Sequence, residues 1–438
     1  MSIPVVTIGA GQAELVGSLE RLHGPVTVVR RCSELAELIA ACQTGLARAA
    51  VVAGGTADIT ATLVDRLATV GVALVGLSDD DAERSRLEGL GVLSAREGVA
   101  ASELAGMIAE AVERAALTSA PAPLSSFAVP GARPLAEPAQ GESSEEPAGE
   151  GEIIAFWGPI GSPGRTTLAV NCAAELVAEG RRVVLVDADT YGASVAAMLG
   201  LLDDSAGLAQ ACRLADQGLL DRQSLERIAT PVIMGPAAGV GTLRVLTGLT
   251  RADRWPEIRA AALGAVLERC REIADSVIVD AGFCLEADEE LSFDTMAPRR
   301  NAATLRSLEV ADRVFAVGAA DPVGMPRLVR ALGELEQAVP QASPAVVFNK
   351  VRPGSVGRFP ERALREAWDR FGPAHPITAM IPFDGAAADA ALLGGSVLLE
   401  AAPESGIRNS IARLVCEPAQ HDRRFARRKT KAGVGAER

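Results

Sequence analysis

Short apolar runs rich in β-branched residues alternate with helical stretches along most of this chain, and this alternation restricts the fold more than any other feature. Five such runs open the chain: Ile3–Ile8, Val26–Val29, Ala50–Ala53, Val72–Leu77 and Gly91–Leu93. Stretches with apolar residues at helical spacing follow them in turn: Gln12–Leu22, Ser33–Cys42, Asp58–Thr69, Asp81–Leu90 and Ala100–Ala116. Strands that alternate with helices form a parallel sheet with helices on both faces. Residues 1–117 are therefore predicted to form a flavodoxin-like α/β domain.

The same alternation returns on a larger scale in residues 152–417. Seven strands are predicted there: Ile153–Trp157, Val183–Asp187, Arg244–Thr247, Val277–Asp280, Val314–Val317, Val346–Asn349 and Ile377–Ile381. Helical patterns separate them, the clearest being Thr166–Glu179, Pro256–Glu272 and Arg327–Gln337. Sheets of this kind bind ligands at the carboxyl ends of their strands. We therefore predict a second, mostly parallel α/β domain with its site at that edge.

Two segments differ from both domains in composition. Residues 118–151 hold six prolines and end in the acidic run GESSEEPAGE, so we predict a flexible linker. Residues 418–438 carry seven cations and two acids. A solvated basic tail is the favoured prediction, and attraction to anionic lipid or nucleic acid is the alternative.

The overall composition excludes several classes of protein. With 43 Lys+Arg against 56 Asp+Glu, the net charge of −13 argues against a protein that coats nucleic acid. The apolar fraction of 48% excludes wholesale disorder. The seven cysteines form no C-x-x-C pair, which is typical of a reducing cytosol, and no apolar run has the length of a bilayer. A cytoplasmic globular protein is predicted.

The segment after the strand Ile153–Trp157 carries the strongest chemical signal. A loop rich in Gly, Pro and Ser leads into a helix that begins near Gly164. Loop amides and a helix N-terminus together form a cradle for phosphate groups. The phosphate-loop pattern is G-x-x-x-x-G-K-[ST]. Gly164 and Thr166 fit it, whereas Pro159 replaces the first glycine and Arg165 replaces the lysine.

Polar residues end three of the predicted strands that follow. The run VVLVDAD ends in Asp187 and Asp189, VIVDAG contains Asp280, and VFNK contains Asn349. The order and spacing of these elements resemble the MinD/ParA superfamily of P-loop ATPases, which have a deviant Walker A loop. The resemblance covers nearly all of residues 152–415.

This resemblance implies a P-loop NTPase domain with ATP and Mg²⁺ as its cofactors. It places nucleotide contacts at Gly161, Ser162, Gly164, Arg165, Thr166, Thr167, Asn349 and Pro382. It also implies that Thr166, Asp187 and Asp280 form the metal site. Asp189 would be the catalytic residue that orients the attacking water.

The loop departs from the superfamily pattern K-G-G-x-G-K-T-T. Ile160 stands in place of the signature lysine, which reaches across the dimer in the superfamily. Arg165 replaces the phosphate-binding lysine with a bulkier planar cation, and Pro163 removes a loop amide. Slow ATP hydrolysis, nucleotide binding alone and a scaffold without hydrolysis therefore all stay open.

The first domain resembles a response-regulator receiver without its chemistry. Ala53, Gly54 and Gly55 stand where a receiver has its acceptor aspartate, and Ser94 stands in place of its lysine. A pseudo-receiver joined to a MinD-like ATPase resembles the CpaE/TadZ group, which helps to place and assemble Tad-type pili and secretion machines.

That resemblance implies a homodimer that positions or assembles a membrane-associated machine. It also implies a protein partner for the first domain and peripheral contact with the cytoplasmic membrane face, whereas nucleic acid is not an expected partner. A DNA-partition ATPase is the third hypothesis. The cluster Arg299, Arg300 and Asn301 follows the Asp280 strand and is interpreted either as a nucleotide-sensing loop or as a solvated helix start.

Overall fold

A computed structural model of the chain describes residues 2–9, 12–22, 24–118, 151–161, 163–201, 205–235, 240–286 and 298–416. The chain divides into two compact units. The first comprises Met1–Gly149 with Leu214–Leu219, and the second comprises Glu150–Arg213 and Leu220–Arg438. Nearly all of the predicted linker, and the whole of the predicted basic tail, lie outside the described residues.

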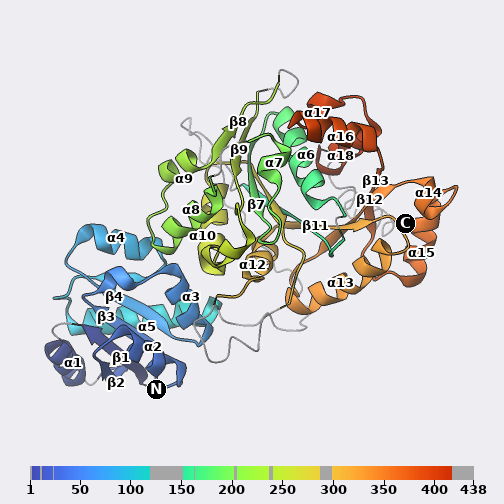
Figure 1. Cartoon of the computed structure of the whole chain (residues 1–438). Helices are drawn as coiled ribbons and strands as arrows, with labels where there is room; N and C mark the ends of the chain where they lie inside the picture. The colour runs from blue at the N-terminus through green and yellow to red at the C-terminus, as the bar shows by residue number, and fades with distance from the viewer. Residues whose placement is uncertain are drawn as a thin grey trace, which may run out of the picture. The chain divides into compact units, whose positions relative to one another are not determined.

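The first unit contains a parallel sheet of five strands in the order β2-β1-β3-β4-β5, which is the flavodoxin-like order (Figure 1). The strands are β1 (Ile3–Gly9), β2 (Val26–Cys32), β3 (Ala49–Ala53), β4 (Ala73–Leu77) and β5 (Leu93–Ala95). The helices are α1 (Gln12–Arg21), α2 (Leu35–Gln43), α3 (Ala61–Thr69), α4 (Asp81–Gly89) and α5 (Ala101–Thr118). The prediction of an α/β fold is confirmed for this unit.

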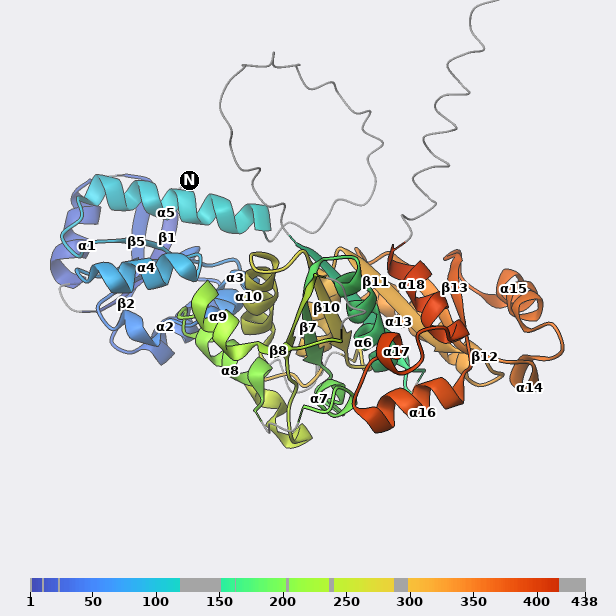
Figure 2. The same ribbon diagram turned by 90° about the horizontal axis from the view of Figure 1, so that it is seen from above.

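Two apolar cores lie on the two faces of this sheet. Leu38 of α2, Leu67 of α3 and Leu87 of α4 pack on one face. Leu19 of α1 and Ile108 of α5 pack on the other, and Figure 2 shows α5 running along that face. Alternate residues of each strand point to opposite faces, so strands that are buried on both faces are almost wholly apolar.

The second unit contains an eight-stranded sheet in the order β13-β12-β11-β6-β10-β7-β9-β8 (Figure 1). The strands are β6 (Glu152–Trp157), β7 (Arg182–Ala188), β8 (Thr230–Val232), β9 (Thr242–Leu246), β10 (Ser276–Ala281), β11 (Arg313–Ala319), β12 (Pro344–Val351) and β13 (Ile377–Pro382). All neighbours are parallel except β8 and β9, which are antiparallel. The seven predicted strands are present, and β8 is the one that the sequence analysis did not find. It is a three-residue edge strand, and its Pro231 is tolerated only at an edge.

Helices cover both faces of this sheet. They are α6 (Arg165–Ala178), α7 (Val195–Met198), α8 (Gly207–Asp216), α9 (Arg222–Ile228), α10 (Ala260–Arg271), α12 (Ala302–Val310), α13 (Gly324–Ala338), α14 (Pro353–Val356), α15 (Pro360–Phe371), α16 (Gly385–Gly394), α17 (Leu398–Ala401) and α18 (Gly406–Cys416). Helices α6 and α18 pack together on one face, where Arg408 forms an ion pair with the buried Glu175 at 2.7 Å (Figure 2). Helices α10, α12 and α13 lie against the other face.

One predicted helix starts later than expected. The pattern Pro256–Glu272 predicts a single helix, but a 3₁₀ turn spans Ala252–Glu257 and α10 begins at Ala260. Ile258 and Arg259 have ψ values of 86° and 147°, so the backbone leaves the helical region between the two pieces. Among the described residues, no helix combines the length and the hydropathy that a bilayer span requires.

Candidate functional site

The loop between β6 and α6 is held open as a cradle by glycine. Gly164 is the N-cap of α6 and has a φ of 95°, which favours glycine. A Cβ at this position would lie 2.3 Å from Nδ2 of Asn349, so no other residue fits without displacing that side chain. The helix N-terminus behind it leaves its first amides for an anion. Of the loop residues assigned to the nucleotide, Ser162 lies outside the described residues.

The end of β12 is attached to this loop. Nδ2 of Asn349 donates a hydrogen bond to the carbonyl of Pro163 at 2.8 Å, and its Oδ1 accepts one from the amide of Lys350 at 2.8 Å. Lys350 has a φ of 60°, the only positive φ of a non-glycine residue in the described part of the chain. Its Cε lies 4.0 Å from the Cβ position of Gly164. Asn349 therefore fixes the loop, and its contact with adenine stays a prediction.

Pro382, the other residue assigned to adenine, ends the edge strand β13. The next amide, that of Phe383, donates to the carbonyl of Val351 at 2.9 Å. The guanidinium of Arg352 lies over the Phe383 ring, 4.8 Å from its centroid. The end of β13 is thus fixed to the end of β12, on the same side of the sheet as Asn349.

Two buried carboxylates face each other across neighbouring strands. Asp187 of β7 and Asp280 of β10 are paired in register, and each is 1% exposed. Asp187 accepts hydrogen bonds from the amides of Val195 at 3.0 Å and Asp189 at 3.4 Å. Neither oxygen of Asp280 accepts a well-formed hydrogen bond in the described residues, and the nearby Thr166 hydroxyl lowers the pKa of this carboxyl. A buried carboxylate without partners is costly, and a cation would satisfy it.

Burial dominates the electrostatics of this pair. It raises the pKa of Asp187 to about 7, and the charge of Asp189 adds to that increase. It raises the pKa of Asp280 to about 8, where Asp187 adds to the increase and the charge of Arg165 opposes it. Both carboxyls therefore hold a proton more strongly than an exposed aspartate. They would release it when a divalent cation enters.

The residues around Asp280 suit Mg²⁺ better than they suit a metal ion whose ligands are all protein side chains. The described part of the chain contains no group of three or more His, Cys, Asp and Glu side chains placed to hold a metal ion. Thr166 lies at the start of α6, and its hydroxyl oxygen is 3.4 Å from the hydroxyl oxygen of Ser194. Mg²⁺ usually takes one or two protein ligands and completes its shell with water and substrate phosphates. Thr166 and Asp280 could supply such ligands.

Arg165 does not extend freely into the loop. Its Nη2 lies 3.1 Å from Oδ2 of Asp189, and its Nη1 donates to the carbonyl of Gly158 at 3.0 Å. The amides of Tyr191 and Gly192 donate to the other oxygen of Asp189 at 2.9 Å and 3.2 Å. The sequence analysis placed both ends of this ion pair in the site but did not predict that they pair. The loop cation neutralises Asp189 in this structure.

Tyr191, which the sequence analysis did not select, connects the segment after β7 to the start of α12. Its hydroxyl donates to Oδ1 of Asn301 at 2.8 Å, and its ring packs on Phe283. The guanidinium of Arg300 lies 4.0 Å from the centroid of the Tyr191 ring. The cluster at 299–301 is therefore the start of a helix with Asn301 buried, rather than a fully solvated surface. This packing joins the loop of Asp189 to the loop that follows Asp280.

The comparisons with known proteins agree with this geometry. Residues 151–224 match the ParA family, described as "NUBPL iron-transfer P-loop NTPase". A ParA-family ATPase from Chlorobium tepidum is similar in structure, with 18% sequence identity, a TM-score of 0.50 and alignment over 61% of this chain and 99% of that one. The second unit has the fold of a ParA-family ATPase.

Two more distant similarities were found. The cell division ATPase MinD of Pyrococcus furiosus aligns with 61% of this chain and 98% of its own, at 19% identity and a TM-score of 0.47. An iron-sulfur cluster carrier protein of Deinococcus radiodurans is 58% identical over 40 residues. That match spans 9% of this chain and 11% of the relative.

Proposed function

We propose that this protein is a MinD/ParA-like ATP-binding protein. Its second unit would bind ATP with Mg²⁺ and dimerise when the nucleotide is bound. This dimerisation would position or assemble a membrane-associated machine. The machine would be a Tad-type pilus or secretion system, or one at the division site. The main support is the glycine-built loop at the start of α6, which lies beside the unpartnered buried carboxylate of Asp280. This arrangement suits a bound phosphate chain with its metal.

In this proposal each residue has a distinct task. Backbone amides from Gly164 to Thr167 bind phosphate oxygens, and the Thr166 hydroxyl and Asp280 hold Mg²⁺ with support from Asp187. The metal neutralises charge on the phosphates. Asp189 orients the attacking water. Because Asp189 is paired with Arg165, hydrolysis requires that this ion pair open first.

The partners are proposed on the same basis. A second copy of the chain would complete the nucleotide-bound state, and the first unit, as a pseudo-receiver, would bind a protein partner. We place the protein in the cytoplasm, at the inner face of the membrane when the machine is assembled. The net charge of −13 disfavours nucleic acid as a partner.

A scaffold without hydrolysis is the second candidate, and a specific observation favours it. The cation of the loop is engaged by Asp189, and the position of the signature lysine is an apolar side chain, Ile160, that is 61% exposed. Carriage of an iron-sulfur cluster is named for the relative that matches over 40 residues, and iron transfer is named in the description of the matching family. Clusters of that kind are held by several thiolates, and five of the seven cysteines here are buried in the core.

Calorimetric titration of the full chain with ATP and Mg²⁺ tests the proposal. We expect micromolar affinity, which Arg165→Ala should reduce at least tenfold. Arg182→Ala is the matched control, because Arg182 forms a similar ion pair with Asp275 at the opposite end of β7. No binding up to millimolar ATP would favour the scaffold. If the protein hydrolyses ATP, Asp189→Ala should abolish turnover and preserve binding.

A further inference from the structure

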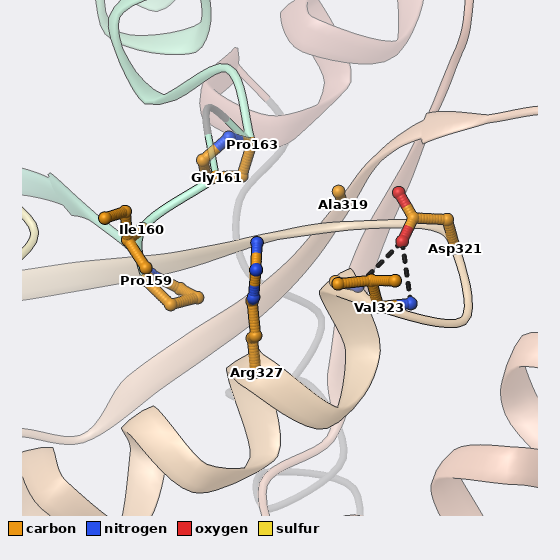
Figure 3. A pocket seen from close by; sticks show the side chains of 9 residues that line it. Pro159, Ile160, Gly161, Pro163, Ala319, Asp321, Val323 and Arg327 are labelled. Atoms are coloured by element: carbon orange, nitrogen blue, oxygen red, sulfur yellow. Dashed lines mark hydrogen bonds between the residues drawn. The ribbon is translucent and has the colours of Figure 1, made fainter.

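A small cavity of about 70 Å³ lies beside the phosphate loop (Figure 3). The first half of the loop, the end of β11 and the first turn of α13 enclose it. Its lining consists of Pro159, Ile160, Gly161, Pro163, Ala319, Asp321, Val323, Gly324 and Arg327. The volume exceeds what a single water needs. A small anion or one phosphate group would fit there.

Only two lining residues are charged, and one of them is already engaged. Oδ1 of Asp321 accepts hydrogen bonds from the amides of Val323 at 2.9 Å and Gly324 at 2.7 Å, so this carboxylate caps α13. Arg327, one turn further along α13, points its guanidinium toward the loop (Figure 3). The guanidinium donates no hydrogen bond and forms no ion pair with any residue that the structure describes.

The guanidinium of Arg327 lies directly against the loop backbone. A Cβ at Gly161 would be 2.6 Å from its Nη1, and Gly161 has a φ of 119°. The absence of a side chain at this position therefore allows the cation to approach the peptide. A guanidinium has a planar fork of N–H donors that suits phosphate oxygens, and here it lies beside the loop backbone.

Arg165, the arginine of the loop itself, cannot bind a phosphate group in the same way while it remains paired. Arg165 binds Asp189 and the carbonyl of Gly158. Ile160 contributes no charge. A polyphosphate at this loop would carry several negative charges, and Arg327 is the cation whose donors remain available on the cavity side.

We infer that Arg327 is a phosphate-binding residue, which supplies from α13 a positive charge in addition to that of Arg165, whose guanidinium is paired with Asp189. The inference rests on the proposed function, because it names the cation that selects a polyphosphate at the same loop. The shared ligand chemistry is a phosphoryl group, either at the end of a nucleotide or in free inorganic phosphate or pyrophosphate. The sequence analysis placed Arg327 only as the first residue of a predicted helix.

Titrations of the full chain with ATP, ADP, pyrophosphate and orthophosphate, each with Mg²⁺, test the inference. We expect Arg327→Ala to weaken ATP binding at least tenfold and to reduce its salt dependence, with partial recovery in Arg327→Lys. Arg330→Ala is the matched control, because Arg330 is exposed on the same helix and its Nε donates to a carbonyl of that helix. Thermal unfolding of each variant separates a loss of binding from a loss of structure.

The possible results distinguish this inference from the proposed function. Unchanged ATP affinity in Arg327→Ala overturns the inference and leaves ATP binding intact. A weakened affinity with a lowered unfolding temperature that Arg327→Lys does not recover also overturns it, because the role is then structural. Binding of pyrophosphate or orthophosphate, but not ATP, that depends on Arg327 supports the phosphate site and contradicts the nucleotide function. No binding of any of the four ligands overturns both.

Discussion

The two sheets of this chain follow the same doubly wound plan but differ at the carboxyl ends of their strands. In the first unit, β1 and β3 end in Gly9 and Ala53, and a Cβ on Gly9 would lie 1.5 Å from the Ala53 carbonyl oxygen. In the second unit, β7 and β10 carry Asp187 and Asp280 at the same edge. One edge is closed by backbone contact, and the other holds buried charge. The fold therefore supplies the position of a site, and the residues at that edge decide whether chemistry follows.

The largest expected effect comes from opening the closed edge. Gly9→Ala should destabilise the first unit by about 4 kcal/mol or more, because the added methyl group collides with the backbone of Ala53. Nucleotide titration of the second unit should not change. Calorimetric unfolding measures the first effect, and Gly106→Ala, in open space on α5, should instead stabilise by about 0.5–1 kcal/mol. An unchanged unfolding profile would show that the edge is not closed.

The charged edge should make stability depend on pH. Folding raises the pKa of Asp187 to about 7 and that of Asp280 to about 8, so the folded protein keeps protons that the unfolded chain releases near pH 4. The free energy of unfolding should therefore fall as pH rises from about 4 to about 8, by up to about 1.4 kcal/mol per pH unit for each carboxyl that stays protonated. Urea unfolding without nucleotide or Mg²⁺ measures it.

Asp280→Asn should make that pH profile shallower, because an amide does not titrate and Asp187 alone then contributes. Asp369→Asn, at an exposed position on α15, provides the control and should keep the slope. A rise of stability with pH over this range would contradict the assignment of buried, protonated carboxyls.

The phosphate loop of the second unit should tolerate an added methyl group at Gly164 no better than the first unit tolerates one at Gly9. Gly164→Ala forces a left-handed φ on alanine and displaces Asn349 from Pro163. ATP affinity should fall about 100-fold, equivalent to about 3 kcal/mol. Gly354→Ala, where a Cβ has open space, is the control. Retained affinity in Gly164→Ala would mean that the loop does not contact the nucleotide.

A smaller effect should follow from the ion pair between α18 and α6. Arg408→Ala leaves Glu175 buried without its partner and should cost the second unit about 2 kcal/mol. Arg413→Ala, on an exposed position of the same helix, should change stability by less than about 0.5 kcal/mol. Chemical unfolding compares the two variants, and equal losses would indicate that the pair adds nothing to the packing of α18.

Sequence periodicity predicted most of the fold because each central strand is buried on both faces and therefore reads as a continuous apolar run. It missed β8, which is three residues long and contains a proline. It also joined a 3₁₀ turn to α10, since both carry apolar residues at similar spacing.

The candidate site was predictable where its residues end strands, as Asp187 and Asp280 do. Partners from distant segments were not, because nothing in the local sequence indicates that Arg165 pairs with Asp189 or that Tyr191 contacts Asn301. Arg327 lies inside a helix that reads as an ordinary amphipathic one. Tertiary contact alone brings it to the loop.

The contact between Gly9 and Ala53 also has an evolutionary consequence. Ala53 is 4% exposed and belongs to the apolar core on the α1 and α5 face, so an acid introduced there would be buried among apolar side chains. A phosphate-accepting aspartate at this edge would require several substitutions together, and each alone would lower stability. Substitutions on the outer surface of the first unit should therefore accumulate during evolution far more easily than substitutions at this edge of its sheet.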